Sequence, residues 1–461
     1  MIRSKGYGRE ERRALLFSEG TRLCFLGIGG ISMYALAVLC HANGVCVLGA
    51  DRTENERTQS LRRLGIRIFV PEAGVAVESA TAVVCSLALD ENAPDLLRAR
   101  EKGIPVLTRG ELLGALMEEY TVSLAVSGTH GKSTVTAALA GIFSAAGKAP
   151  TVLAGERLPK SQESFLLGKK EYLIAEACEY GDSFLSLRPS VSLFLNLEWD
   201  HPDYFSSEEK LVRSFARAAM GSGSVLYGSG SPLLAEMVEQ YGIKNAISVG
   251  CRAEDDYRYE LLSYENACAR LRFYPMGGEP VTVSLSVPGR FQMHNAAMAL
   301  AAASYVGIPN ETAAAALSSF CGIHRRLSCI DAHGAYPIYY DYAHHPTEIR
   351  AGIETLRDLH SAPITVLFRP HTYSRTVALF ESLAAALSTA DRLFVTDIDG
   401  AREKEGSISA QALAEAAGGT YLPLSQAASY LKISDGPLVL MGAGDLSAVL
   451  SVLSDDRKEG G

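Results

Sequence analysis

The chain lacks several features that would place it in a specialised class of protein. Its nine cysteines are scattered, and no pair has the C-x-x-C spacing of a zinc or redox site. This pattern predicts reduced thiols in a cytoplasmic protein and not a disulfide framework. No apolar run reaches the length that crosses a bilayer, and the first five residues are too polar for a secretory signal peptide. We therefore expect a cytoplasmic protein without membrane insertion.

An excess of positive charge is also missing. The net charge of −9 argues against a broad nucleic-acid-binding surface, although a local phosphate site can still be built from backbone dipoles and a few basic side chains. The hydrophobic share of 48% and the charged share of 21% are typical of a soluble globular protein. A chain of 461 residues exceeds what one hydrophobic core usually supports, so we expect two or three domains.

Predicted strands and helices alternate in three sets, which favours three α/β domains with mostly parallel sheets. The first set has strands at 21–26, 45–48, 82–86 and 104–107 and helices at 31–42 and 110–119. The second has strands at 122–126, 172–177 and 191–197 and helices at 132–146 and 295–306. The third has strands at 338–341, 364–368, 392–396 and 438–441 and helices at 375–388 and 409–417. We place the domains at residues 1–119, 120–325 and 326–461.

Residues 124–134 carry the most specific signal, because a strand runs through a glycine-rich turn into a helix and ends in Gly-Lys-Ser. The usual phosphate-loop spacing puts the first glycine where this chain has Val126, and the extra glycine is Gly128. The variant Gly-Thr-x-Gly-Lys-Ser is fully met. In such a loop backbone N–H groups hold phosphate, Lys132 reaches the outer phosphates and the Ser133 hydroxyl binds Mg²⁺. The alternative is an ordinary tight turn.

A second glycine-rich turn follows the first predicted strand. It contains Gly27, Gly29 and Gly30, and Asp51 ends the next strand, where dinucleotide-binding folds place an acid for a ribose. Ser32 stands where the third glycine of that fingerprint would fall. The turn therefore predicts a nucleotide-binding unit and matches the NAD fingerprint only in part.

Polar residues follow two strands of the second set. Glu176 ends a strand in the sheet that carries the phosphate loop, where a second Mg²⁺ ligand is expected, or else it is a solvated strand-end acid. Four polar side chains follow the next strand: Asn196, Glu198, Asp200 and His201. His201 could bind a second metal ion through its neutral imidazole, or it could be structural.

Three later segments, residues 324–326, 341–348 and 369–375, are rich in histidine and arginine, and the last two directly follow predicted strands. Arginines suit the charge of a transferring phosphoryl group, and Arg375 could hold a carboxylate by two hydrogen bonds. Each segment alone could instead form surface salt bridges.

In their order along the chain, these motifs resemble the Mur ligase family. The resemblance rests on residues 27–30, 51–55, 127–133, 176–183, 196–201, 288–295, 341–348 and 370–376. It implies a three-domain architecture with a Rossmann-like N-terminal domain for a UDP-sugar, a central P-loop ATPase-type domain and a Rossmann-like C-terminal α/β domain for an amino acid.

The resemblance also implies an activity. The chain would be an ATP-dependent, ADP-forming ligase that joins L-alanine to the lactyl carboxylate of UDP-N-acetylmuramate through an acyl phosphate, in peptidoglycan precursor synthesis. ATP and Mg²⁺ would be required. The partners would be these small molecules and no nucleic acid, and the protein would be a monomer or homodimer.

The resemblance further assigns residues to roles. The catalytic residues would be Lys132, His201, His344 and Arg375. The ATP site would contain Gly128, Thr129, His130, Gly131, Lys132, Ser133, Thr134, Gln292, Asn295, Arg326 and Asp341. The UDP-sugar site would contain Gly27, Gly29, Gly30 and Asp51, and the amino-acid site His344, His371 and Arg375. The metal ligands would be Ser133, Glu176 and His201.

Departures from the family pattern keep alternatives open. Ser32, Phe291, Tyr340 and Arg369 are unusual, whereas the absence of a lysine near Arg217 fits the alanine-adding branch, which does not use a carbamylated lysine. A ligase that recycles murein tripeptide onto the same sugar nucleotide is one alternative, although its G-x-C-G amino-terminal loop is missing. A nicotinamide-dependent oxidoreductase and a non-catalytic paralogue that binds UDP-sugar are the others.

Overall fold

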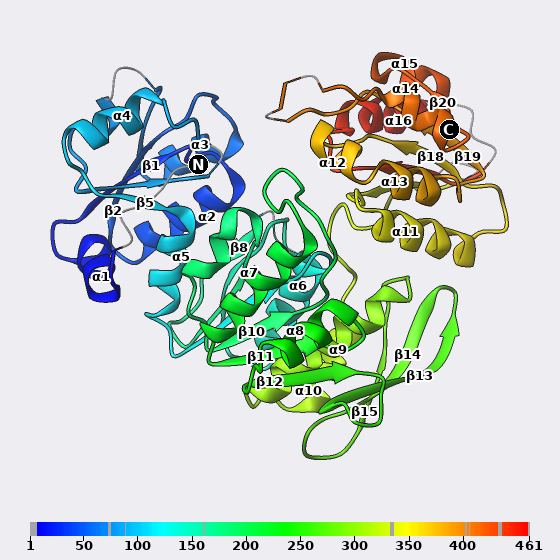
Figure 1. The fold of residues 1–461 in the computed structure, drawn as a ribbon, viewed down its shortest axis with the longest axis horizontal. Coiled ribbons are helices and arrows are strands. Elements are labelled where there is room, and N and C mark those ends of the chain that lie inside the picture. The colour runs from blue at the N-terminus through cyan, green and yellow to red at the C-terminus, as the bar shows by residue number, and fades with distance from the viewer. Residues whose placement is uncertain are drawn as a thin grey trace. The chain divides into compact units, whose positions relative to one another are not determined.

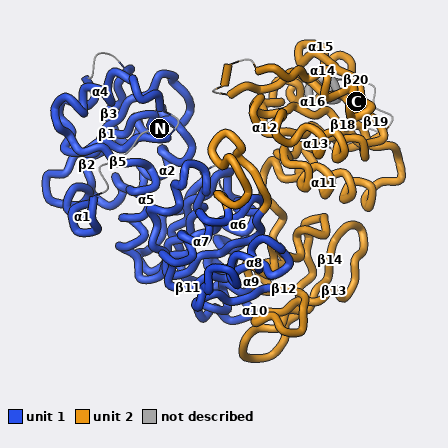
Figure 2. Tube along the Cα trace, viewed as in Figure 1, with its two compact units in different colours: residues 1–197, 212–249, 301–313 blue, residues 198–211, 250–300, 314–461 orange. Residues whose placement is uncertain are grey.

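The computed structural model describes residues 7–71, 75–87, 89–159, 161, 163–331, 336–401, 403–404, 406–431 and 436–459. It divides into two compact units, coloured separately in Figure 2. Unit 1 comprises residues 1–197, 212–249 and 301–313, and unit 2 comprises residues 198–211, 250–300 and 314–461. Each unit combines sheets with helices (Figure 1). Each also has buried apolar residues that form a core of its own.

The first sheet of unit 1 is parallel, with the strand order β3-β2-β1-β4-β5. Its strands are β1 Arg22–Leu26, β2 Cys46–Ala50, β3 Arg67–Phe69, β4 Ala82–Cys85 and β5 Val106–Thr108. Its helices are α1 Arg9–Phe17, α2 Ile31–Ala42, α3 Glu56–Arg63, α4 Pro94–Glu101 and α5 Arg109–Met117, with a short 3-10 turn η1 Val75–Val77. The strand order reverses between β1 and β4, so the glycine-rich turn after β1 opens at the edge where such sheets bind ligands.

The second sheet is ten-stranded, and its unit 1 strands have the order β12-β11-β10-β6-β9-β7-β8. Of the pairs formed by these seven strands, only β7–β8 is antiparallel among those described here. These strands are β6 Val122–Ser127, β7 Thr151–Leu153, β8 Phe165–Leu166, β9 Tyr172–Glu176, β10 Val191–Phe194, β11 Ser224–Gly228 and β12 Ala246–Gly250. The other elements of this part of the chain are α6 Lys132–Ala145, η2 Tyr180–Ser186, α7 Glu208–Met220, α8 Pro232–Gln240, α9 Phe291–Tyr305 and α10 Asn310–Ser318. Helices α7, α9 and α10 each contain residues of both units. Strands β6 and β10 are almost fully buried, as expected for central parallel strands covered on both faces.

Two glycines bring helix α5 against η2 and so join the two sheets of unit 1. A Cβ atom on Gly110 would lie 2.6 Å from the carbonyl oxygen of Ser183, and one on Gly114 would lie 2.3 Å from that of Ser186. Residues four positions apart share one face of a helix, so both glycines meet the same turn. Any residue with a Cβ atom at position 110 or 114 would displace η2.

Unit 2 begins with an antiparallel ribbon of β13 Tyr257–Glu265, β14 Cys268–Tyr274 and β15 Val281–Ser284. Asn266 and Ala267 connect β13 and β14 and have φ angles of 50° and 56°. Positive φ at both central residues is typical of a tight two-residue hairpin turn, whose twist matches the twist of the flanking strands.

The C-terminal sheet of unit 2 has the order β16-β17-β21-β18-β19-β20, with β16 antiparallel to β17. Its strands are β16 Ser328–Asp331, β17 Ile338–Asp341, β18 Thr365–Phe368, β19 Arg392–Val395, β20 Thr420–Tyr421 and β21 Leu438–Met441. Its helices are α11 Pro346–Leu359, α12 Tyr373–Ala378, α13 Phe380–Leu387, α14 Ala410–Ala416, α15 Leu424–Leu431 and α16 Ser447–Glu459. Val366 and Phe368 pack with α11, α13 and α14, whereas Leu367 packs with α15 and α16, because successive strand residues face opposite sides.

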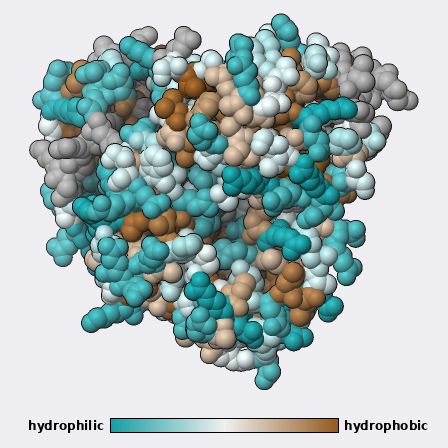
Figure 3. Space-filling view, turned by 45° about the vertical axis from the view of Figure 1, so that its right-hand side comes forward, coloured by the Kyte–Doolittle hydropathy of each residue, from teal (hydrophilic) through white to brown (hydrophobic). Residues whose placement is uncertain are grey.

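The visible face in Figure 3 is mostly hydrophilic, with small separate hydrophobic patches. Among the helices that the structure describes, none is both long and apolar enough to cross a membrane.

Candidate active site

The phosphate loop has the backbone geometry that its glycines require. Gly128 has a φ of +139° and Gly131 a φ of +84°, and both values lie in a region that residues with a Cβ rarely adopt. Gly131 caps α6 and makes no side-chain hydrogen bond to it. Since the first N–H groups of a helix have no intrahelical partner, the start of α6 offers backbone donors and a positive dipole end to an anion.

Lys132 lies folded back on this loop. Its Nζ donates to the carbonyl oxygens of Gly128 at 2.5 Å and Thr129 at 3.3 Å, and lies 3.2 Å from the Glu179 carboxylate. The Glu179 side chain is only 4% exposed. Burial acts to lower the pKa of Lys132, but the charge of Glu179, the hydrogen bond that it accepts from the lysine and other nearby acidic groups together outweigh burial, so the pKa lies above its ordinary value and the amine is charged. The lysine is thus a half-buried cation within the loop that a polyphosphate would enter.

In unit 1, Ser133 and Glu176 carry side-chain oxygens that are suitable ligands for Mg²⁺, which prefers hydroxyl, carboxylate and water oxygens. Ser133 is buried at the first turn of α6, and Glu176 ends β9, the parallel neighbour of β6. The Glu176 Oε1 accepts a hydrogen bond from the Gly155 N–H at 2.6 Å. A Cβ on Gly155 would lie 2.9 Å from Oε2, so glycine keeps the space beside this carboxylate. The third predicted ligand, His201, belongs to unit 2.

The loop after β1 is braced by Asp51. The Gly29 N–H donates to Asp51 Oδ2 at 2.7 Å, and the Thr53 N–H donates to Oδ1 at 3.1 Å. A Cβ on Gly29 would lie 2.9 Å from the Asp51 carboxylate, so glycine is required for this approach. Gly27 has a φ of +78° and Gly30 caps α2. The four residues predicted for the UDP-sugar site thus lie at the carboxyl edge of the first sheet, with Gly27, Gly29 and Gly30 after β1 and Asp51 after the neighbouring β2.

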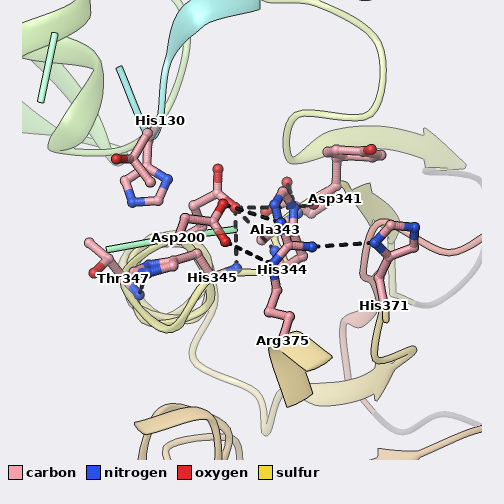
Figure 4. Close-up of polar contacts among 12 residues, drawn as sticks. His130, Asp200, Asp341, Ala343, His344, His345, Thr347, His371 and Arg375 are labelled. Atoms are coloured by element: carbon pink, nitrogen blue, oxygen red, sulfur yellow. Dashed lines mark hydrogen bonds and ion pairs between the residues drawn. The ribbon is translucent and has the colours of Figure 1, made fainter. Parts of the chain in front are cut away.

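In unit 2, Arg375 and Asp200 form a buried ion pair (Figure 4). Arg375 Nε donates to Asp200 Oδ1 at 2.9 Å and Nη2 donates to Oδ2 at 3.2 Å, and both side chains are 7% exposed. Arg375 Nη1 lies 3.3 Å from Nδ1 of His371. One N–H on each Nη atom is left over, so a substrate carboxylate could meet Arg375 at that edge.

These contacts fix the charge states around the pair. Burial acts to raise the pKa of Asp200, but His201 and Arg375 lower it well below its ordinary value, so the carboxylate stays ionised. Burial lowers the pKa of His344 to about 3, which keeps this imidazole neutral. His344 Nδ1 lies 2.9 Å from the Tyr342 carbonyl oxygen and therefore carries the proton, which leaves Nε2 as an acceptor.

Four more predicted ATP-site residues lie in unit 2. Asn295 Nδ2 donates to Gln292 Oε1 at 3.2 Å, and both side chains are buried on α9. Arg326 Nη1 donates to Glu348 Oε1 at 3.3 Å. Burial raises the pKa of Asp341 to about 6, against the opposing charge of Arg326. Asp341 ends β17 and lies within the electrostatic influence of Arg326.

The sequence did not predict several of these contacts. Glu179, the counter-charge of Lys132, follows Glu176 by three positions but was given no role. Glu198 was named only as a polar residue, yet its Oε2 accepts a hydrogen bond from Thr347 Oγ1 at 2.5 Å and lies 3.3 Å from His345 Nδ1. Such partners are distant in the sequence, so no local pattern signals them.

Together, the phosphate loop of α6 and the three α/β sheets define a nucleotide-dependent α/β enzyme. Three family models match the chain: "Mur ligase family, catalytic domain" at residues 22–121, "Mur ligase middle domain" at 126–303 and "Mur ligase, glutamate ligase domain" at 325–444. The chain therefore belongs to the Mur ligase family and has its three-domain architecture.

Individual relatives agree with this assignment. The UDP-N-acetylmuramate--L-alanine ligase of Caldanaerobacter subterraneus subsp. tengcongensis is 33% identical over 452 residues, which cover 95% of this chain and 98% of the relative. The ligase of the same name from Agathobacter rectalis is 35% identical over 396 residues, covering 84% and 85%. The crystal structure of UDP-N-acetylmuramate-alanine ligase from Thermotoga maritima matches with a TM-score of 0.79 at 25% identity, covering 95% of this chain and all of that one.

Proposed function

We propose that this chain is an ATP-dependent ligase that joins L-alanine to the lactyl carboxylate of UDP-N-acetylmuramate. ATP transfers its γ-phosphoryl group to that carboxylate, and the amine of L-alanine attacks the acyl phosphate. An amide, ADP and inorganic phosphate result. The observation that carries the proposal is the half-buried Lys132 at the start of α6, where Gly131 provides no side-chain cap, in a chain whose relatives over most of its length are named for this reaction.

In this proposal the residues of unit 1 bind the UDP-sugar and the phosphates of ATP. The Gly29 loop with Asp51 receives the UDP-sugar, because this turn lies at the switch point of the first sheet. The α6 start receives the ATP phosphates, and Lys132 leaves Glu179 to neutralise the charge that develops on the γ-phosphoryl group. Both roles follow from backbone N–H groups and fixed charges that are in place before any ligand binds.

Ser133 and Glu176 would hold one Mg²⁺ ion, and His201 would hold another. When bound, Mg²⁺ would neutralise phosphate charge and lower the repulsion between the carboxylate and ATP. His201 has an unusual φ of 55° and its N–H donates to the Asp200 carboxylate at 2.7 Å, so its backbone is held in one conformation. A fixed backbone limits the positions that its imidazole can reach.

The residues around Asp200 would serve the amino acid. Arg375, with one N–H left on each Nη atom, would hold the α-carboxylate of L-alanine by two hydrogen bonds. Neutral His344, whose Nε2 is an acceptor, would accept a hydrogen bond from the incoming amine. His371 would fix the far side of the Arg375 guanidinium.

The experiment is to incubate the protein with UDP-N-acetylmuramate, ATP and Mg²⁺ and with one acceptor at a time. We expect mass spectrometry to detect the amide with L-alanine, together with ADP and phosphate. Glycine, L-serine and murein tripeptide serve as the competing acceptors. A product with tripeptide and none with L-alanine would identify the recycling reaction instead, and no ATP consumption with any acceptor would contradict the proposal.

A further inference from the structure

Asn196, directly after β10, contacts the phosphate loop at three points. Its Oδ1 accepts a hydrogen bond from the His130 N–H at 2.8 Å, and its Nδ2 donates to the His130 carbonyl oxygen at 3.1 Å. Its main-chain oxygen accepts a hydrogen bond from the Thr129 N–H at 3.3 Å. One amide side chain thus holds both polar groups of the His130 backbone.

The backbone of the loop packs directly on this segment. A Cβ on Gly128 would lie 3.1 Å from the carbonyl oxygen of Asn196 and 3.1 Å from the Cβ of Leu195. The Leu195 N–H donates to the Ser127 oxygen at 3.0 Å, so the β6–β10 pairing continues up to the loop. Gly128 therefore serves close packing on Asn196, which accounts for a glycine at this position of the loop.

The contacts also divide the loop's backbone donors into two groups. The N–H groups of Thr129 and His130 are used by Asn196, so they are directed away from a ligand. The donors that remain at the start of α6 belong to Gly131 and the residues after it, where Gly131 provides no side-chain cap. A loop whose donors are aimed before the ligand arrives loses less conformational freedom on binding.

We propose that Asn196 is a positioning residue that holds the phosphate loop in its ATP-binding conformation and confines phosphate binding to the N–H groups from Gly131 onward. The proposal rests on the proposed function, because it assumes that the loop binds ATP. Asn196 acts through the loop and touches no substrate.

The test compares Asn196→Leu with Asn245→Leu. Leucine has nearly the size of asparagine but cannot form either side-chain hydrogen bond. Asn245 is the matched control, since its side chain likewise makes two hydrogen bonds to main-chain groups of unit 1: its Nδ2 donates to the carbonyl oxygens of Ser222 and Gly223, both at 3.0 Å. Asn196→Ser is the second variant, which remains informative if the leucine variant does not fold.

The measurements are the dissociation constants of a non-hydrolysable ATP analogue and of UDP-N-acetylmuramate, the KM and kcat for ATP, and hydrogen exchange of the loop amides. For Asn196→Leu we expect about tenfold weaker analogue binding, from the loss of two hydrogen bonds, with UDP-N-acetylmuramate binding unchanged. The KM for ATP should rise more than kcat falls. Exchange at Thr129 and His130 should accelerate in this variant and not in Asn245→Leu.

Each other outcome has a definite meaning. Wild-type affinity for the analogue in both Asn196 variants would overturn the inference, and so would an equal loss in Asn245→Leu. If the wild-type protein bound UDP-N-acetylmuramate but not the ATP analogue, the proposed function itself would be wrong.

Discussion

Replacing Asp200 with asparagine should destabilise unit 2, because it removes the charge that compensates Arg375. Both side chains are buried, and the guanidinium forms two hydrogen bonds to the carboxylate. Removing one partner of a buried ion pair typically costs about 3–5 kcal/mol. Because asparagine keeps one acceptor, we expect the free energy of unfolding to fall by about 3 kcal/mol. At about 2–4 °C per kcal/mol, the melting temperature of unit 2 should fall by about 6–12 °C.

The control is Asp397→Asn in the same unit, since Asp397 accepts hydrogen bonds from neutral donors, the Tyr421 hydroxyl and the Leu424 N–H. It should cost about 1 kcal/mol. The pH dependence gives a second check. Because the folded pKa of Asp200 is depressed, its contribution is complete above the unfolded value of about 4 and is lost as the pH falls through the folded pKa.

Thermal unfolding of wild type, both single variants and Asp200→Asn with Arg375→Gln, from pH 7 down to pH 3, measures all of these effects. The difference in the free energy of unfolding between wild type and Asp200→Asn should stay constant above about pH 4 and become smaller below it. The double variant should cost less than the sum of its two single changes. A cost for Asp200→Asn no larger than that for Asp397→Asn would refute the reasoning.

Four further predictions concern single residues. Lys132→Ala should abolish phosphate release while UDP-N-acetylmuramate binding, measured by calorimetry, stays near wild type; normal turnover would remove Lys132 from the site. His201→Ala should raise the Mg²⁺ concentration needed for half-maximal rate, and an unchanged Mg²⁺ dependence would return His201 to a structural role. Gly114→Ala should lower the free energy of unfolding by about 1–3 kcal/mol, because the new methyl group clashes with η2. The control is Gly141→Ala on α6, which has open space around it and should be neutral or stabilising by up to about 1 kcal/mol. Equal melting temperatures of the two variants would contradict the packing argument. In the wild type, His344 accepts a proton at about pH 6.5 when the chain is unfolded but only at about pH 3 when it is folded, so the free energy of unfolding falls as the pH drops between these values. His344→Gln should make this fall smaller. Parallel curves of unfolding free energy against pH for the two proteins would show that His344 does not contribute.

The elements that could be predicted from the sequence are those with a strong apolar pattern. The helix at 31–42 and the strands at 338–341 and 438–441 have the predicted bounds, since their buried side chains form uninterrupted or regularly spaced apolar runs. The predicted helix 375–388 is instead two helices, α12 and α13, because Leu379 has φ −109° and ψ 17° and interrupts the helical backbone. Residues 375–388 contain neither glycine nor proline, so the sequence does not signal this break.

The antiparallel ribbon of unit 2 was missed, although part of its signal was readable. In β14 the buried Ala269, Leu271 and Phe273 alternate with outward-facing residues, which is the period of a half-buried strand. Asn266 is a residue that tolerates positive φ in a turn. The repeated βα pattern of the chain favours parallel sheets, so this alternation was not recognised as an antiparallel strand.

For the site, the residue types were predictable and the partners were not. The phosphate loop, Glu176 and the polar run 196–201 are local patterns. The pairing of Asp200 with Arg375 joins positions 175 apart, and the Lys132–Glu179 contact depends on the register of β6 with β9. Only the tertiary fold brings such groups together, so the assignment of roles to the site residues stays a prediction.

The close approach of Gly110 and Gly114 to η2 has a consequence for substrate encounter. It makes the turn after β1 and the loop before α6 parts of one folded body. In the proposed reaction two polyanions must meet, and free in solution they would lose translational and rotational freedom at every encounter. Because the distance between the two proposed binding loops is set when the chain folds, the proposed reaction would start from two polyanions held by one body, at a high effective molarity.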